Sequence, residues 1–426
     1  MRSPCAGLRV AALSLSLWLG LASAVVLAAD SPTEQTSSYD AWLPSAGMGF
    51  ADYVQRSHVR LREVLSQAYF RNSTAPFGPG IDVDAVVDAR GPYEWRPAAD
   101  CRGDGQGMGF LLIHGLTDSP YLLRDVAASL RAAYPCALLR GVLLPGHGTV
   151  PADTLDMRHE DWLSITDYGV NSFRGEVEAL YMVGFSTGTS LSVRYADAHR
   201  DDSLIRGLIM LSPAIEAKSA VAFLSPYVRW FRNWLSQGPE DDFARYTSFS
   251  MNAGAEFYLL TQNLSREDFV PLSVPVFMAG SGDDATVNME SAREFFCAKT
   301  PPGRRQMLWY RSATTGSDPA AYCDGLQVLS AEAPQYRVVS FSHTSLSMSP
   351  DNPHYGVAGD YPVCDSYRRD PAVFAQCVHD DAQTVYGERG LGENGRLDGK
   401  LVRRGTFNPG YTAMMAQILR FIGSNP

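Results

Sequence analysis

Lysine is scarce in this chain of 426 residues and occurs only at Lys218, Lys299 and Lys400, so arginine supplies nearly all of the positive charge. Lysine and arginine together number 36 against 46 aspartates and glutamates, which gives a formal net charge of −10 at pH 7. A chain with an excess of acid is repelled by phosphate backbones and by anionic lipid surfaces. The charge therefore argues against nucleic acid and against an anionic membrane surface as partners.

The chain also lacks the residue spacing of a zinc site, and after residue 29 it lacks long apolar runs. No CxxC pair and no cluster of histidine and cysteine has the spacing of a zinc site, so we expect neither a metal nor a cofactor. After residue 29, no stretch is long and apolar enough to span a membrane. Hydrophobic residues nevertheless make up 45% of the chain, which is enough for the core of a large globular domain.

The first 29 residues have the features of an export signal. Arg2 and Arg9 precede a run from Val10 to Ala29 that contains only serine and glycine besides apolar residues, and Ala22-Ser23-Ala24 offers a cleavage site. The alternative is an uncleaved anchor, because the run is long enough to cross a bilayer. We expect cleavage, a periplasmic or secreted protein, and no stable membrane span afterwards.

Six cysteines follow this segment, an even number that predicts up to three disulfides in an oxidising compartment. Six cysteines allow 15 pairings. We hypothesise that neighbours in the sequence pair with each other, which joins Cys101 to Cys136, Cys297 to Cys323, and Cys364 to Cys377.

An apolar run from Leu180 ends in a G-x-S-x-G motif, from Gly184 to Gly188. A strand that delivers a serine on a sharp turn into a helix needs small residues at both flanks, because backbone atoms crowd there. Such a turn presents the Ser186 hydroxyl to a histidine and aims the Thr187 N–H at the same point. The motif also arises by chance in glycine-rich chains, so the rest of the sequence must decide its meaning.

Two further apolar runs end in glycine turns that contain a histidine. Residues 109–113 lead into His114-Gly115-Leu116, and residues 136–144 lead into Pro145-Gly146-His147-Gly148. For both histidines, bracing of the turn is a better interpretation than a catalytic role.

Together these motifs resemble the α/β-hydrolase superfamily, within it the branch of monoacylglycerol lipases, small bacterial carboxylesterases and serine aminopeptidase-like hydrolases. The matching elements, in the family's order, are Leu112-Ile113-His114-Gly115, Leu144-Pro145-Gly146-His147-Gly148, Asp161-Trp162 and Gly184 to Gly188. The resemblance covers roughly residues 90 to 425. It implies an α/β fold with a mostly parallel central sheet, flanking helices and a helical cap. It also implies that the N–H groups of Leu116 and Thr187 form the oxyanion hole.

The triad acid is expected on the loop after the strand predicted over residues 274–280. Asp284 stands three positions before Val287, as in the D-x-x-V pattern of the family. Asp283 more simply shapes the turn. We therefore assign the acid to Asp284.

The triad base is expected last in the order Ser, Asp, His. Residues 336–344 form a β-branched run that predicts a strand ending at His343. His354 is the competitor, but it follows Asp351, Asn352 and Pro353 in a loop-like stretch that should be less constrained. We therefore assign the base to His343.

We divide the chain into a signal peptide over residues 1–29, a leader and packed helix over residues 30–89, and a hydrolase domain over residues 90–426. Within the first 90 residues, an amphipathic helix is predicted from Phe50 to Tyr69 and a loop over residues 72–88. The cap insertion is expected at about residues 214–270, and residues 312–335 are expected to be irregular. The cap insertion contains many aromatic residues. They are expected to contact an apolar acyl group of the substrate or, with equal weight, to pack in the core.

The sequence thus predicts an exported serine hydrolase that cleaves carboxylic esters with an apolar acyl group through an acyl-enzyme. One alternative is an amidase or aminopeptidase-like enzyme in which a cap carboxylate binds the substrate amine; the candidates are Glu216, Glu240, Asp241 and Asp242. A second alternative is a catalytically silent binding module on the same fold.

Overall fold

Eight strands form one central sheet in the computed structural model, which describes residues 37–40, 42–45, 47–71 and 76–425. In chain order they are β1 (Tyr93–Trp95), β2 (Met108–Ile113), β3 (Leu138–Val142), β4 (Ala179–Phe185), β5 (Ile205–Leu211), β8 (Val276–Ser281), β9 (Arg305–Arg311) and β10 (Leu326–Ser330). Their order across the sheet is β1-β3-β2-β4-β5-β8-β9-β10, and every neighbouring pair is parallel except β1 with β3. The predicted mostly parallel sheet is confirmed, while the expected signal peptide lies outside the described residues.

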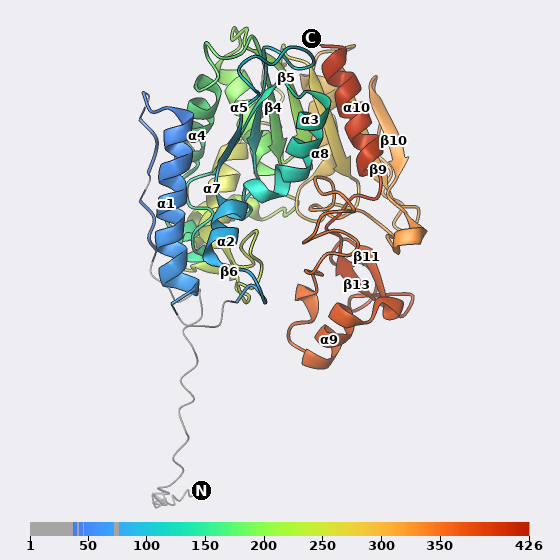
Figure 1. Ribbon diagram of the computed structural model, residues 1–426. Helices are drawn as coiled ribbons and strands as arrows, with labels where there is room; N and C mark the ends of the chain where they lie inside the picture. The colour runs from blue at the N-terminus through green and yellow to red at the C-terminus, as the bar shows by residue number, and fades with distance from the viewer. Residues whose placement is uncertain (1–36, 41, 46, 72–75, 426) are drawn as a thin grey trace, which may run out of the picture.

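Helices cover both faces of this sheet (Figure 1), which explains why its central strands are apolar along nearly their whole length. One face packs against α4 (His159–Asn171), α5 (Thr187–Ala198) and α8 (Met289–Lys299), and the other against α3 (Arg124–Ala133) and α10 (Tyr411–Gly423). Successive side chains of a strand point to opposite faces. In β2, Leu111 and Ile113 accordingly join the first core, whereas Phe110 and Leu112 join the second.

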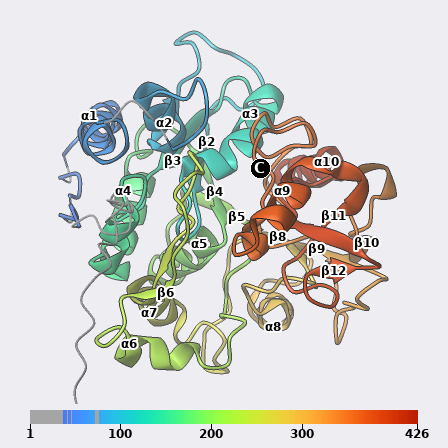
Figure 2. The same ribbon diagram turned by 90° about the horizontal axis from the view of Figure 1, so that it is seen from below.

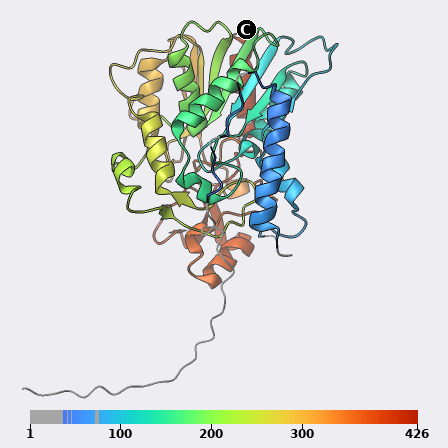
Figure 3. The ribbon, with the colours of Figure 1, turned by 90° about the vertical axis from the view of Figure 1, so that its left-hand side faces the viewer.

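The helix predicted from Phe50 to Tyr69 is confirmed as α1, and it lies along the outside of the molecule (Figure 3). A second helix, α2 (Val83–Arg90), packs beside it, so the loop expected over residues 72–88 was wrong at its C-terminal end. The side chain of Asp82 accepts a hydrogen bond from the backbone of the first turn and caps this helix. Val87 is then buried against α1, and this tertiary contact is not visible in the local sequence.

The cap segment, residues 214–270, joins β5 to β8 and is less helical than predicted. Its elements are a short 3-10 turn (Ala222–Leu224), α6 (Ser225–Val228), the hairpin strands β6 (Trp234–Ser236) and β7 (Phe249–Ser250), and α7 (Met251–Thr261). Helix α7 packs against α4 and α5. Four aromatic residues of the cap segment are exposed and so do not pack in the core, namely Phe223, Tyr227, Trp230 and Phe231, while contact with a substrate stays a prediction.

A second insertion, residues 344–410, separates His343 from α10 and was not predicted. We call it the C-terminal insertion. It contains α9 (Pro371–His379) and a three-stranded sheet of β11 (Thr384–Gly387), β13 (Lys400–Arg404) and β12 (Arg396–Leu397). It lies below the sheet in Figure 1, at the end where the parallel strands finish. Seen from below, in Figure 2, it faces the cap segment across this end of the molecule.

The segment that carries His343 is not a strand of the main sheet, so that prediction was wrong. Arg337 adopts a left-handed conformation with a φ of 57°, which interrupts any extended run. The Val339 N–H donates to the carbonyl of Tyr386 in β11, so this segment pairs with the C-terminal insertion. The eighth strand of the sheet is β10, in a stretch expected to be irregular.

Three disulfides join cysteines that are neighbours in the sequence, which confirms the hypothesised pairing. Cys101 bonds to Cys136, Cys297 to Cys323 and Cys364 to Cys377. The last of these closes a loop of the C-terminal insertion onto α9. In the part of the chain that the structure describes, no helix combines the length and apolar character of a membrane span.

We expect none of these six cysteines to react as a free thiol in the mature protein, because each has a disulfide partner. The measurement is a thiol titration of the denatured protein before reduction, with a reduced sample as the control that releases all six. Six reactive thiols before reduction would contradict the disulfide assignment.

Candidate active site

Ser186 stands alone between β4 and α5, on the turn predicted from the G-x-S-x-G motif. Its backbone has a φ of 51° and a ψ of −117°, a conformation that residues other than glycine rarely adopt. The two flanking glycines are where the backbones crowd. A Cβ on Gly184 would lie 2.6 Å from the carbonyl carbon of Gly188, and a Cβ on Gly188 would lie 2.0 Å from the carbonyl oxygen of Ile113. The predicted need for small residues is confirmed.

We expect Gly188→Ala to lower the free energy of unfolding by about 1–3 kcal/mol, because the added methyl meets backbone that cannot rotate away. Chemical denaturation measures this loss. The matched control is Gly254→Ala, since Gly254 also lies in the first turn of a helix but its Cβ would meet nothing closer than 3.5 Å. Equal stability of the two variants would contradict the crowding argument.

The structure brings Ser186, His343 and Asp284 into one chain of hydrogen bonds. The Nε2 atom of His343 lies 2.8 Å from the Ser186 Oγ atom, and its Nδ1 atom lies 2.6 Å from Asp284 Oδ2. A carboxylate can only accept, so Nδ1–H donates to Asp284 and Nε2 accepts from the serine hydroxyl. The three side chains are buried. They have the arrangement of a nucleophile, a base and an orienting acid.

The Asp284 carboxylate is fixed on its other oxygen as well. Oδ1 accepts the backbone N–H groups of Thr286 at 2.7 Å and Val287 at 3.0 Å, which leaves Oδ2 for the histidine. Burial acts to raise the pKa of Asp284, but the charge and hydrogen bond of His343, together with these two N–H groups, hold it below its ordinary value. Asp284 is therefore a carboxylate at neutral pH.

Two buried serines that sequence reasoning missed brace the histidine loop against the sheet. The Ser212 hydroxyl, just after β5, donates to the carbonyl of His343 at 2.7 Å. The Ser281 hydroxyl, at the end of β8, donates to the carbonyl of Phe341 at 2.8 Å. Both serines end strands, which is where side chains of neighbouring strands gather at one edge of a parallel sheet.

The N–H groups of Leu116 and Thr187 donate to no protein acceptor among the described residues. Thr187 opens α5, and the first N–H groups of a helix have no partner within the helix. The turn that carries Leu116 lies against the serine, since a Cβ on Gly115 would be 3.0 Å from Ser186 Cβ. Both groups are thus available to an oxyanion, and that role remains a prediction.

The chain matches the alpha/beta hydrolase family over residues 110–322, which is half of its length. It belongs to the alpha/beta hydrolase family. A thermostable monoacylglycerol lipase of Bacillus sp. (strain H-257) is 29% identical over 116 residues, which are 27% of this chain and 44% of the lipase. The matched stretch therefore spans less than half the length of that relative.

Solved structures similar to this alpha/beta hydrolase include a soluble variant of monoglyceride lipase from Saccharomyces cerevisiae, with a TM-score of 0.42 and 16% identity. That match covers 52% of this chain and 81% of the lipase. A monoacylglycerol lipase of Paleococcus ferrophilus gives a TM-score of 0.40 and 18% identity, over 52% of this chain and 88% of its own.

His114 braces two turns of the hydrolase, as expected. It is fully buried, its Nδ1–H donates to the Gly115 carbonyl at 2.8 Å, and its Nε2 accepts the Leu144 N–H at 3.0 Å. Burial, reinforced by the neighbouring His147, holds the pKa of His114 well below its ordinary value, so the ring is neutral. Neither ring nitrogen is left for chemistry at Ser186.

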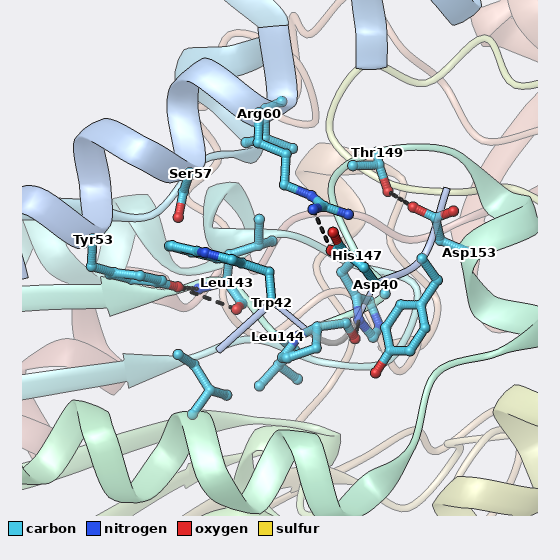
Figure 4. A pocket seen from close by; sticks show the side chains of 15 residues that line it. Asp40, Trp42, Tyr53, Ser57, Arg60, Leu143, Leu144, His147, Thr149 and Asp153 are labelled. Atoms are coloured by element: carbon cyan, nitrogen blue, oxygen red, sulfur yellow. Dashed lines mark hydrogen bonds and ion pairs between the residues drawn. The ribbon is translucent and has the colours of Figure 1, made fainter. Parts of the chain in front are cut away.

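His147 lines a cavity of about 50 Å³ that lies under α1 and the segment before it (Figure 4). Burial lowers the pKa of His147 to about 4, and its Nε2 atom has no hydrogen-bond partner among the residues that the structure describes. Arg60 and Asp40 form an ion pair beside this cavity. The volume is that of a water site and not of an organic substrate. None of the triad residues lines it.

His354 does not reach Ser186, and the expectation that its segment is loosely held was wrong. It is 4% exposed, with Nε2 3.1 Å from Asp242 of the cap segment and Nδ1 2.6 Å from Asp360 of the C-terminal insertion. Burial acts to lower the pKa of His354, but these two carboxylates raise it overall. His354 therefore links the cap segment to the C-terminal insertion.

The four cap carboxylates considered as amine-binding groups all have protein partners. Asp242 also accepts the Tyr355 hydroxyl at 2.5 Å. Asp241 is paired with Arg368 at 2.9 Å, and Glu240 accepts two backbone N–H groups of the cap. Glu216 accepts the hydroxyl of Ser291. Asp241 and Asp242 are thus paired with positive side chains and Glu240 is buried against backbone donors, whereas Glu216 is exposed and has only a hydroxyl partner.

One group of possible metal ligands is formed by His159, Glu160 and Glu256, whose ligand atoms lie within 4.8 Å of one another. Glu256 already accepts from His159 Nδ1 at 2.6 Å and is paired with Arg229 at 2.5 Å. These contacts connect α4 to the cap segment. They account for the cluster as a hydrogen bond and an ion pair that hold α4 to the cap segment.

Proposed function

We propose that this alpha/beta hydrolase is an exported serine hydrolase that cleaves carboxylic esters. The observation that carries the proposal is the hydrogen-bonded chain from Ser186 through His343 to Asp284. A serine is a weak nucleophile until a base removes its proton, and a base works only when it is oriented. Ser186 supplies the nucleophile, His343 the base and Asp284 the group that orients the base, and each lies within hydrogen-bond distance of the next.

In the proposed reaction, each residue of the triad has a distinct role. Ser186 Oγ attacks the ester carbonyl while His343 Nε2 takes its proton, and Asp284 stabilises the resulting imidazolium. The N–H groups of Leu116 and Thr187 bind the oxyanion, and each such donor typically contributes about 10²–10³ in rate. His343 passes its proton to the departing alcohol, which leaves Ser186 acylated. Water, activated by the same histidine, hydrolyses the acyl-enzyme.

Esters with an apolar acyl group are the proposed substrates. The support is the similarity to a monoacylglycerol lipase, which is limited to 116 residues, together with the family motifs. Export is supported by the N-terminal signal pattern and by three disulfides, which form and persist in oxidising compartments.

The two alternatives receive less support. An aminopeptidase-like enzyme needs an anionic group for the substrate amine, and three of the four cap carboxylates proposed for it, Glu240, Asp241 and Asp242, are engaged by protein groups, which leaves only the exposed Glu216. A silent binding module does not require a complete and hydrogen-bonded triad.

A substrate panel tests the proposal. We expect hydrolysis of nitrophenyl esters of graded acyl length and covalent labelling by a fluorophosphonate, with much slower cleavage of aminoacyl arylamides. Faster cleavage of the arylamides would support the aminopeptidase alternative. Absence of both hydrolysis and labelling would support the binding module.

A further inference from the structure

A single buried carboxylate, Glu388, joins the loop of the acid to the loop of the base. Its Oε2 atom accepts the backbone N–H of His343 at 2.9 Å and that of Ala285, next to Asp284, at 3.3 Å. Glu388 is 1% exposed and directly follows β11 in the C-terminal insertion. One oxygen atom thus holds the backbone of two segments that are 58 residues apart, from 285 to 343.

The other oxygen of Glu388 is fixed by the C-terminal insertion itself. Oε1 accepts the Arg389 N–H at 2.7 Å and the Arg404 Nε–H at 3.3 Å. The parallel pairing of β11 with β13 sets Gly387 opposite Arg404. The carboxylate of Glu388, the next residue, therefore lies beside the positive charge of Arg404. Both arginines also donate to the Thr286 hydroxyl, at 2.9 Å and 3.2 Å. The insertion therefore contacts the acid loop at two consecutive residues.

We infer that Glu388 is the positioning residue of the triad, acting through the backbone of His343 and Ala285. This inference rests on the proposed function. The segment before His343 is not a strand of the main sheet, and hydroxyls at the ends of the strands, those of Ser212, Ser281 and Ser312, hold it at the edge of the sheet. Glu388 ties the His343 N–H and the acid loop to a single oxygen, which sets the separation of the base from its acid.

Glutamine cannot replace this carboxylate, although it has the same shape. All groups around the two oxygens are donors, and a carboxylate is a pure acceptor. An amide that turns its oxygen toward His343 and Ala285 points its NH₂ group at the Arg389 N–H and at Arg404. The reverse orientation leaves the His343 N–H without an acceptor, and a buried unpaired donor is costly.

We expect Glu388→Gln to lower kcat about 10²-fold with little change in KM, since a misplacement of about 1 Å at a reacting group costs this much. The rate of fluorophosphonate labelling should fall in parallel. Glu388→Asp keeps the charge and should retain more activity than Glu388→Gln.

The matched control is Glu240→Gln. Glu240 is a buried glutamate of the cap segment that also accepts two backbone N–H groups, from Thr247 at 3.0 Å and Ser248 at 2.8 Å. Its replacement should cost stability without changing kcat. Thermal unfolding of both variants allows activity to be expressed per folded molecule.

A readout that needs no turnover separates this inference from the proposed function. The proton shared by His343 Nδ1 and Asp284 should give a far-downfield NMR signal in the wild-type protein and in Glu240→Gln. We expect this signal to be lost or displaced in Glu388→Gln. An unchanged signal, or a wild-type kcat per folded Glu388→Gln molecule, would overturn the role of Glu388. A wild-type protein with the signal but without esterase activity would overturn the proposed function alone.

Discussion

Replacing Ser186 with alanine is expected to abolish ester hydrolysis and fluorophosphonate labelling, with kcat reduced by about 10⁴-fold or more. Only the hydroxyl is lost, and with it the one atom placed 2.8 Å from the base. Alanine retains the Cβ, so the turn keeps the packing it has around Ser186. The fold should remain intact, which circular dichroism and a denaturant titration can establish.

Ser192→Ala provides the control for that variant. Ser192 is a fully buried serine of α5, the helix that follows Ser186, but its hydroxyl donates to the Gly188 carbonyl at 2.8 Å and has no contact with the triad. It should keep wild-type activity and labelling. Labelling of the Ser186→Ala protein at another serine would refute the assignment of the nucleophile.

The second large effect is a loss of kcat that distinguishes His343 from His354 as the base. We expect His343→Ala to lower kcat by about 10⁴-fold or more, because the serine then has no base. His354→Ala should lower kcat far less. It should instead reduce the free energy of unfolding, since Asp242 loses a partner in a fully buried position. If His354→Ala proved the more damaging to kcat with the fold intact, the base would have to be reassigned.

The neighbouring aspartates offer the same kind of comparison. Asp284→Asn should cost heavily in kcat, because an amide does not stabilise the imidazolium and does not fix the tautomer that leaves Nε2 free to accept. Asp283→Asn should leave kcat nearly unchanged, because the side chain of Asp283 accepts a hydrogen bond from Thr315 and makes no contact with His343. Steady-state kinetics on the two variants, at a pH above the acidic limb, gives the comparison directly.

The features that the sequence predicts well depend on short stretches of chain. The apolar period of α1 and the glycines around Ser186 encode their structures locally, and both are confirmed. The assignment of Asp284 likewise used a strand and the four residues after it. The structure places this residue, and not Asp283, beside His343. Its catalytic role stays a prediction.

The features that the sequence did not reveal depend on pairing between distant segments. Residues 336–344 have the composition of a strand, and their local pattern therefore predicted that the main sheet holds His343. The segment instead pairs with Tyr386 of the C-terminal insertion. Glu388 lies in no motif, because its importance comes from two N–H groups located 45 and 103 residues earlier. A single sequence carries no signal for such contacts.

The place of the C-terminal insertion in the chain also sets the order in which the catalytic machinery is completed. Ribosomes deliver residues in sequence, so the C-terminal insertion is made after the segments that carry the triad. Ser186 and Asp284 belong to the part made first, whereas Glu388, which accepts the His343 N–H, and Tyr386, which pairs with Val339, are made near the end of translation. Under the proposed mechanism, a chain that ends before residue 386 has Ser186 but lacks the proposed positioning residue of His343. We expect hydrolytic activity only from chains that include the C-terminal insertion.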